Sequence, residues 1–359
     1  MTTMDGGGPG LDTTGVRPAG TAGGRPSGRP VPPAGRPFLP IRRQGPVVVA
    51  GDLVLDLVVQ VPERLHRGSD TWGALHPRQG GSAANTAAWL ARLGVPVVFC
   101  GRVGRDPLGQ ALAAALEAEG VEVRAVRDDQ APTGVILALV GPDGEKSMVI
   151  GPGANHRLEA SDLPPGLVEG AGLCYLTGYS FFWEGARDAA RAVMARALKA
   201  GVPVAVDASS AALLARQGPE GILQQWQGAS ILFANEEEAA VLAGGAFRDG
   251  AAERLGRFFP LVGVKAGPRG AWGVALGRRW RVEALPVPQV IDTTGCGDAW
   301  NAGMLAGLRA GLGPEAAARL GRFVAAWVAQ RPGAVPSGWT ATDRQAAWDH
   351  ANQAAAEVP

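Results

Sequence analysis

This chain of 359 residues has few cysteines, few aromatic residues and almost no net charge. Its three cysteines, Cys100, Cys174 and Cys296, are too few and too widely spaced for a disulfide framework or a zinc cluster, which favours a reducing compartment. The formal net charge is +1, from 34 basic and 33 acidic residues, so no overall field attracts nucleic acid or an anionic membrane. We therefore expect a small-molecule partner, with no nucleic acid and no membrane involved.

Long apolar runs are also absent. No stretch approaches the roughly 20 apolar residues that span a bilayer, and the N-terminus lacks the basic and then apolar order of a secretory signal. These absences predict a cytoplasmic protein. The hydrophobic content of 46% is nevertheless ample for a sizeable core.

Residues 1–45 differ in composition from the rest of the chain. They contain 19 Gly or Pro, and six arginines against two aspartates, with almost no aliphatic periodicity. Such a segment cannot bury enough surface to offset its ordering entropy, so we predict a disordered tail. Its basic bias lacks the interleaved aromatics of a nucleic-acid-binding segment, which favours a solvated tail.

From Val47 onward, short β-branched runs alternate with Ala/Leu-rich helical stretches. This alternation predicts a doubly wound α/β core with a mainly parallel sheet. Two segments, residues 58–79 and 133–150, carry successive strand-like runs without a helix between them, and they predict a small antiparallel sheet that projects as a lid. Ligands of open α/β sheets bind beyond the carboxyl ends of the strands, so functional residues are expected there.

The sharpest motif is DTTGCGDAWNAG at residues 292–303, which follows an apolar stretch and opens a predicted helix. Gly295 and Gly297 allow close approach of the backbone to an anion, and the N–H groups of Gly295, Cys296 and Gly297 would point at a polyphosphate from the helix N-terminus. Asp298 lies in the first turn. Taken alone, it is either a catalytic group or a partner of the helix dipole.

A second motif, GGSAANTA, occupies residues 80–87. A glycine turn here opens a helix of small residues, and Asn85 has both a donor and an acceptor for neighbouring hydroxyls. A tight turn that merely packs its helix on the sheet is the structural alternative.

Together these motifs resemble the C-terminal and N-terminal signatures of the PfkB, or ribokinase-like, carbohydrate kinases, with Cys296 in place of the usual alanine. The resemblance extends from Val47 to Ser337 and implies a ribokinase-like kinase domain over residues 46–355. It implies that Asp298 is the catalytic base and that Gly295, Cys296 and Gly297 form the anion hole. The sugar would contact Gly80, Gly81 and Asn85.

Further motifs follow in the family's order. The position of Asp56, in the GDLVLD stretch at 51–56, binds sugar hydroxyls in the family, although an Asp there could instead be a solvated edge-strand residue. Ribokinases proper carry an asparagine where this chain has Val54, which argues against ribose itself. The GRVGRDPLG stretch at 101–109 resembles a family turn, but Asp106 before Pro107 is better explained as a helix N-cap. Gly153 to Asn155 resembles the family's GAN stretch near the lid.

The nucleotide side is implied by three more stretches. Asn235 to Glu238 matches the family's NxxE motif, in which the asparagine and the last acid organise Mg²⁺ and phosphate through water; a capping box is the structural alternative. Residues 265–270, KAGPRG, resemble the nucleotide loop. The ATP-binding set that the resemblance implies consists of Asn235, Lys265, Gly267, Gly270 and, at the adenine, Arg322.

The loop RPGAVPS at residues 331–337 resembles one that shapes a monovalent-cation site in several members. The implied K⁺ set is Asp292, Thr294, Gly333 and Ser337. One departure from the family follows the strand that ends at Val206, where the chain reads DASS and many relatives place Asn and Arg after the Asp.

These features predict an ATP-dependent kinase that phosphorylates a hydroxyl of a small sugar or sugar-like acceptor. Ser82 stands where phosphosugar kinases and ribokinases usually have lysine, which favours an unphosphorylated sugar, a sugar acid or a nucleoside. A nucleoside kinase would stack the base on an aromatic residue, either Trp72 or one within Tyr179 to Trp183. A catalytically silent sugar or nucleotide sensor is a second alternative. By analogy with relatives, we also expect a homodimer through the lid.

Overall fold

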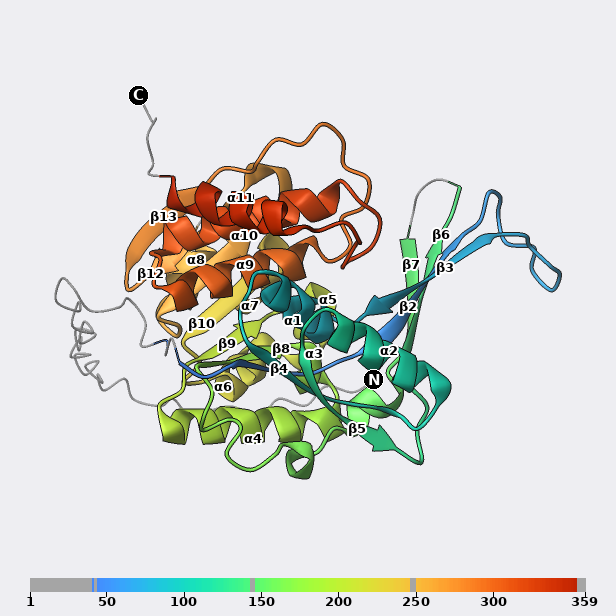
Figure 1. Ribbon diagram of the computed structural model, residues 1–359, viewed down its shortest axis with the longest axis horizontal. Helices are drawn as coiled ribbons and strands as arrows, with labels where there is room; N and C mark the ends of the chain where they lie inside the picture. The colour runs from blue at the N-terminus through green and yellow to red at the C-terminus, as the bar shows by residue number, and fades with distance from the viewer. Residues whose placement is uncertain (1–40, 42–43, 143–145, 246–249, 354–359) are drawn as a thin grey trace, which may run out of the picture. The chain divides into compact units, whose positions relative to one another are not determined.

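The computed structural model describes residues 41, 44–142, 146–245 and 250–353, and the statements below concern these residues. Their main feature is a sheet of nine strands in the order β13-β12-β11-β10-β9-β8-β1-β4-β5 (Figure 1). All neighbours pair in parallel except β11 with β12 and β12 with β13. The strands are β1 (Val47–Ala50), β4 (Val97–Gly104), β5 (Glu122–Asp128), β8 (Leu173–Thr177), β9 (Val204–Asp207), β10 (Ile231–Asn235), β11 (Leu261–Lys265), β12 (Ala271–Ala275) and β13 (Arg278–Val282). The predicted mainly parallel α/β class is confirmed.

Both faces of this sheet are covered by helices, which explains why its central strands are apolar throughout rather than alternating. Alternate residues of β1 point to opposite faces: Val47 and Val49 join one core cluster, and Val48 and Ala50 join the other. The first cluster includes residues of α1 (Ser82–Arg92), α2 (Pro107–Ala118), α9 (Cys296–Ala310), α10 (Pro314–Ala329) and α11 (Ala341–Asn352). The second includes residues of α4 (Glu184–Ala200), α5 (Ala211–Gln217), α6 (Pro219–Gln225), α7 (Glu236–Leu242) and α8 (Ala251–Leu255). Figure 1 shows α4 and α9 on opposite sides of the sheet.

Helix ends follow the predicted local chemistry. Asp106 is the N-cap of α2, with its side chain accepting from the Gly109 N–H at 2.7 Å and Pro107 in the first turn. Gly201 ends α4 in the left-handed conformation, with φ of 64°. No described helix is long and apolar enough to cross a membrane.

A second sheet consists of four strands in the order β3-β2-β6-β7. Its members are β2 (Val54–Gln60), β3 (Ala74–Gly80), β6 (Val135–Val140) and β7 (Lys146–Gly151). The β2–β3 and β6–β7 pairs are antiparallel, but the central pair, β2 with β6, is parallel. The sheet is therefore mixed, because β2 and β6 both leave the main sheet in the same direction and each is followed by its own antiparallel return strand. We call this sheet the lid; it extends from the main sheet in Figure 1.

The predicted tail over residues 1–45 falls mostly outside the described residues. Ile41, however, is 8% exposed and belongs to the first core cluster. The backbone oxygen of Gly45 accepts from the Arg309 guanidinium at 2.7 Å. Ile41 and Gly45 therefore contact the main domain, although one isolated apolar residue among prolines and arginines gives no periodic signal in the sequence.

Candidate active site

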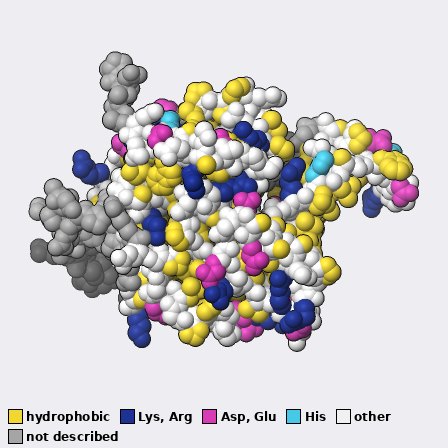
Figure 2. Space-filling view, in the orientation of Figure 1, with side chains coloured by type: hydrophobic (Ala, Val, Ile, Leu, Met, Phe, Trp, Pro, Cys, Tyr) yellow, Lys and Arg dark blue, Asp and Glu magenta, His cyan; other side chains and the backbone are white. Residues whose placement is uncertain are grey.

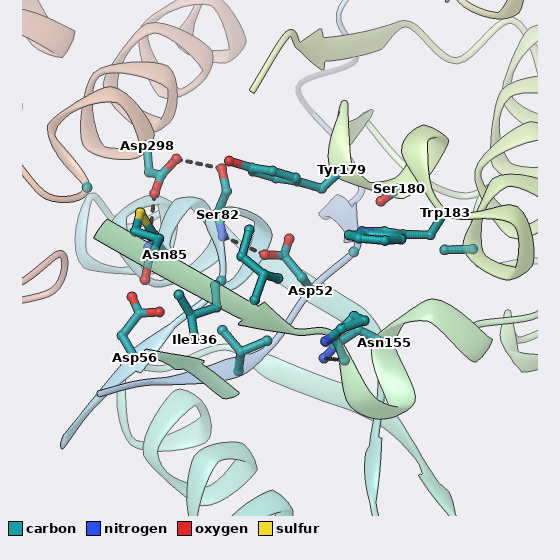
Figure 3. A pocket seen from close by; sticks show the side chains of 18 of the residues that line it. Asp52, Asp56, Ser82, Asn85, Ile136, Asn155, Tyr179, Ser180, Trp183 and Asp298 are labelled. Carbon is teal, nitrogen blue, oxygen red and sulfur yellow. Dashed lines mark hydrogen bonds between the residues drawn. The ribbon is translucent and has the colours of Figure 1, made fainter. Parts of the chain in front are cut away.

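Asp298 is held between the first turn of α9 and the first turn of α1. Its two carboxylate oxygens accept from the Ser82 hydroxyl at 2.6 Å and from the Asn85 side-chain amide at 2.9 Å (Figure 3). Residues more than 200 positions apart in the chain thus meet beyond the ends of the parallel strands. Asn85 and Asp298, both predicted site residues, are thus in direct contact, and Ser82 adds a second donor to Asp298.

Burial raises the pKa of Asp298 from its ordinary value to about 7. The hydrogen bonds from Ser82 and Asn85 oppose this rise, the carboxylate of Asp207 adds to it, and the ammonium of Lys265 opposes it. A carboxylate with a pKa near neutrality can accept a proton in the pH range where cells operate. The site therefore contains a group suited to general-base chemistry.

The glycines before Asp298 allow an unusually close backbone approach. Gly295 has φ of 73°, and a Cβ there would lie 2.3 Å from the Cβ of Ala334. A Cβ on Gly297 would lie 3.6 Å from the Lys265 ammonium, so a cation faces the start of α9. The Cys296 N–H donates to the Thr293 carbonyl at 3.2 Å, which occupies one of the three amides predicted to form the anion hole.

Cys296 has a packing role in this arrangement. Its thiol lies 3.6 Å from the Ala325 carbonyl on α10, and burial raises the pKa of the thiol to about 12. The thiol is therefore neutral near pH 7 and is no nucleophile.

A cavity of about 210 Å³ opens beside Asp298. Five further residues of the predicted site line it: Asp56, Gly81, Asn85, Thr294 and Gly295. Gly80 does not line the cavity but lies against the Asp56 side chain, since a Cβ on Gly80 would lie 2.2 Å from the Asp56 carboxyl carbon. Only glycine leaves room for the Asp56 side chain at this point of β3.

Several lining residues were missed as functional candidates: Asp52, Ile136, Met148, Ile150 and Ser180. Trp183, one of the aromatic residues considered for stacking a base, also lines the cavity. Asp52 has a clear structural part. Its carboxylate accepts from the N–H groups of Ser82 and Ala83 at 2.9 and 3.2 Å, which caps α1 because its own N-cap residue, Gly81, has no side chain. A cap supplied from 30 residues away leaves no local sequence signal.

Asn155 also lines the cavity, but its amide is fully engaged by the protein. Its oxygen accepts from the Leu53 N–H at 2.9 Å, and its nitrogen donates to the Leu53 and Pro152 carbonyls. The GAN stretch therefore joins the loop after β1 to the end of the lid.

On the other side of Asp298 lies a buried polar cluster. The Lys265 ammonium donates to Asp207 at 2.6 Å and to the Asn301 side-chain oxygen at 3.1 Å, and the Asn301 amide donates to the same Asp207 carboxylate. Burial lowers the pKa of Lys265. The carboxylates of Asp207 and Glu238 raise it by more, so the pKa lies above its ordinary value. Asp207 and Asn301 were not among the predicted site residues.

Asn235 and Glu238 form the complete capping box that was the structural alternative. The Asn235 oxygen accepts from the Glu238 N–H at 2.8 Å, and the Glu238 carboxylate accepts from the Asn235 N–H at 2.8 Å. Burial first, and then the charge of Asp207, raises the pKa of Glu238 to about 7. Capping and a part in ligand binding are compatible, since the carboxylate has further lone pairs.

Gly267 and Gly270 lie in the turn between β11 and β12, with φ of 55° and 83°. A Cβ on Gly270 would lie 2.1 Å from the Val282 carbonyl, so this glycine is needed for contact with the end of β13. Arg322 donates to the His350 imidazole at 3.0 Å and to the Glu283 carbonyl at 2.9 Å, which joins α10, α11 and the segment after β13.

Three of the four residues predicted for K⁺ lie together. The Asp292 carboxylate accepts from the Thr294 N–H at 2.9 Å and from the Gly333 N–H at 2.8 Å. Ser337, the fourth, is exposed. Asp292 thus fixes the loop at 331–337 to the segment before α9.

Comparison with known proteins identifies the class of protein to which this fold and site belong. The pfkB family of carbohydrate kinases matches residues 45–341. The chain belongs to this family, and it is a phosphotransferase with an alcohol group as acceptor.

Three relatives illustrate the range of the family. The fructokinase of Klebsiella pneumoniae is 33% identical over 74% of this chain and 85% of its own length. The adenosine kinase of Sinorhizobium meliloti superposes with a TM-score of 0.77 at 28% identity, covering 84% of this chain and 99% of that one. The ribokinase of Arabidopsis thaliana, solved in complex with ribose and ATP, gives a TM-score of 0.70 at 28% identity over 87% of this chain and 100% of that one.

Proposed function

We propose that the protein is an ATP-dependent kinase that transfers the γ-phosphate to a hydroxyl of a small sugar or sugar-like acceptor, with Asp298 as the base. The observation that carries this proposal is the position of Asp298 at the junction of the cavity and the start of α9. Both of its oxygens are fixed by donors from α1, and each retains a lone pair that can accept a proton.

The reaction proceeds in line. The acceptor O–H bond breaks and its proton passes to Asp298, while the acceptor oxygen bonds to the γ-phosphorus and the bond from that phosphorus to the ADP oxygen breaks. Asp56, Gly81 and Asn85 hold the acceptor so that its hydroxyl faces Asp298. Closure of the lid excludes water, which would otherwise hydrolyse ATP at the same position.

The start of α9 and Lys265 fit a transferring phosphoryl group. Its negative charge would meet the amides of Gly295 and Gly297 and the Lys265 ammonium, which Asp207 and Asn301 fix in place. In this proposal Gly267 and Gly270 shape the turn that receives the nucleotide, and Arg322 lies at its adenine end.

The charges around this point also fit a divalent cation. The carboxylates of Asp207, Glu238 and Asp298 all act on the single ammonium of Lys265, so acidic groups outnumber the basic group at this point. Asn235 and Glu238 would hold Mg²⁺ through water, and the ion when bound neutralises charge on the phosphates. K⁺ would be held near Asp292, Thr294, Gly333 and Ser337.

Two further proposals concern the protein's surroundings. Large apolar side chains on the lid are exposed, among them Trp72 at 88% and Val149 at 66%, and Figure 2 shows hydrophobic side chains along the projecting strands. A homodimer through the lid would cover them. Cys100 and Cys174 are buried and unpaired, which agrees with a reducing cytoplasm.

An ADP-release assay over a panel of acceptors tests the proposed function. Purified protein with ATP and Mg²⁺ should release ADP only when an acceptor is added, and mass spectrometry should find the phosphorylated acceptor. ATP binding without turnover on any pentose, hexose, sugar acid or nucleoside would instead support the sensor alternative.

A further inference from the structure

One face of α1 contacts two separate parts of the active-site region. Ser82 and Asn85, in its first turn, hold the two carboxylate oxygens of Asp298. Trp89 and Arg92 follow further along the helix at spacings of four and three residues, so they lie on the same face as Asn85. A single rigid helix thus connects the contacts of Asp298 with those of Trp89 and Arg92.

Trp89 and Arg92 both contact the loop at residues 331–337. The Trp89 indole N–H donates to the Ala334 carbonyl at 2.9 Å, and the Arg92 guanidinium donates to the Pro336 carbonyl at 2.7 Å. Trp89 is fully buried and Ala334 is 3% exposed, so solvent has little access to this contact. Because a buried carbonyl without a donor costs stability, the indole N–H ties the loop to α1.

Neighbouring side chains fix the direction of the Trp89 indole. Its ring meets those of Trp327 and Trp339 edge to face, with centroid distances of 5.6 and 5.1 Å, and the latter two rings meet each other at 5.1 Å. The Arg92 guanidinium lies 4.8 Å from the centroid of the Trp89 ring. Packed rings cannot turn without displacing one another, so the N–H stays directed at Ala334.

The other side of the loop contacts the start of α9. A Cβ on Gly295, the N-cap of α9, would lie 2.3 Å from the Ala334 Cβ, so Ala334 packs directly on this glycine. The Gly333 N–H donates to the Asp292 carboxylate at 2.8 Å. Asp298 follows Gly295 by three residues, in the first turn of the same helix. A displaced Ala334 would therefore leave this turn of α9 without its support.

We propose that Trp89 is a positioning residue for phosphoryl transfer: through Ala334 it holds the loop against Gly295 and so fixes the start of α9. This inference rests on the proposed kinase function and gives a part in it to a side chain outside the cavity. Trp89 is not among the described residues that line the cavity beside Asp298, so it acts through the loop and not on the acceptor. A displacement of groups that stabilise the transition state lowers the rate more than it weakens ligand binding.

Hydrogen exchange in the full chain tests whether Trp89 holds the loop. Trp89→Phe removes the indole N–H and keeps an aromatic ring in the core. Trp348→Phe is the matched control, because the Trp348 indole donates to the Leu93 carbonyl at 3.2 Å instead of to the loop. We expect amide exchange over residues 292–297 and 331–337 to be at least about tenfold faster in Trp89→Phe and unchanged in Trp348→Phe.

Helix α4, on the opposite side of the sheet, is the internal reference for this measurement. Its exchange should stay at the native rate in Trp89→Phe. Equal acceleration of α4 and of the loop would mean that Trp89 only stabilises the core, and it would overturn the proposal. Unchanged exchange at the loop would overturn it as well.

Kinetic measurements test the consequence for the reaction. In Trp89→Phe, kcat should fall at least about tenfold, while KM for the acceptor and for ATP stays within about threefold. The acidic limb of the pH profile should stay near pH 7, because Ser82 and Asn85 still hold Asp298. Trp348→Phe should keep the native kcat. Rates are expressed per mole of protein that binds ATP, so unfolded protein does not lower the measured kcat. A native kcat in Trp89→Phe, or a shifted limb, would overturn the positioning role.

Ala334→Gly tests the same contact without altering the aromatic core. It keeps the carbonyl that accepts from Trp89 and removes the Cβ that packs on Gly295, so kcat should again fall, by at least about threefold, with both KM values kept. A native kcat in Ala334→Gly would show that the loop does not act through Gly295 and would overturn the proposal. Absence of turnover on every acceptor in the native protein counts against the kinase proposal, whereas the exchange experiment still decides whether Trp89 holds the loop.

Discussion

Replacing Asp298 with asparagine should abolish most turnover and at the same time stabilise the protein at alkaline pH. The amide has almost the same shape as the carboxylate. Its oxygen can accept from the Asn85 amide, as Asp298 does at 2.9 Å, and its nitrogen can donate to the Ser82 oxygen once that hydroxyl turns its proton away. The fold should therefore survive. What is lost is the ability to accept a proton, which is typically worth about 10²–10⁴ in rate.

The stability change follows from the raised pKa. A shift from 3.8 to about 7 corresponds to an upper limit of about 4 kcal/mol against the charged form. Because the native pKa lies above the unfolded value, the contribution of Asp298 to stability is fully present below pH 3.8 and is lost as pH rises through 7. Asp298→Asn has no such loss, so its advantage in the free energy of unfolding should grow between about pH 4 and pH 8.

Asp106→Asn is the matched control, because Asp106 also lies at a helix start and accepts from protein donors. Its carboxylate accepts from the N–H groups of Gly109 and Thr133 at 2.7 and 2.8 Å, and the amide would leave one of these donors unpaired. This variant should keep kcat and lose about 1–3 kcal/mol of stability. The assays are kcat at saturating ATP and urea unfolding at pH 5 and pH 8. A native kcat in Asp298→Asn would refute Asp298 as the base. If Asp298→Asn were less stable than the native protein at pH 8, the cost assigned to the Asp298 charge would be refuted.

Four further predictions concern the pH profile, the acceptor, the phosphate and the monovalent ion. The rate should fall tenfold per pH unit below about pH 7, because Asp298 must be ionised to accept the proton. Glu238 has a similar pKa, so the same fall in Glu238→Gln would assign the fall to Asp298. A flat pH profile contradicts the assignment. Asn85→Ala should raise KM for the acceptor at least tenfold and leave ATP affinity within about twofold, whereas the reverse result would show that the two ends of the site are exchanged. Lys265→Met should lower kcat at least a hundredfold and move the acidic limb to higher pH, because the Lys265 charge lowers the pKa of Asp298; an unmoved limb would mean that Lys265 only packs. The rate of phosphoryl transfer should be higher in K⁺ than in Na⁺ buffer. Equal rates in the two buffers would refute the proposed monovalent-cation site at Asp292.

Local chemistry determined a large part of the fold from the sequence alone. The alternation of apolar runs and Ala/Leu-rich stretches predicted the parallel sheet and its helices, because burial on both faces requires strands without polar alternation. The Asp106–Pro107 pair predicted the start of α2, because capping and the fixed φ of proline act within four residues. The glycines around Cys296 predicted a helix start at this point, and Gly295, with φ of 73°, is the N-cap of α9.

Tertiary structure decided which side chains share the site. Ser82 reaches Asp298 across 216 positions, and Lys265 reaches Asp207 across 58, because parallel strands bring their carboxyl ends to one edge whatever their separation in the chain. Neither contact has a periodic or local signature. The raised pKa of Asp298 likewise depends on burial, which the first turn of a helix does not determine by itself. The same reason applies to the acceptor cavity, whose acidic and apolar residues come from the lid and the main domain and line one cavity only in the folded chain.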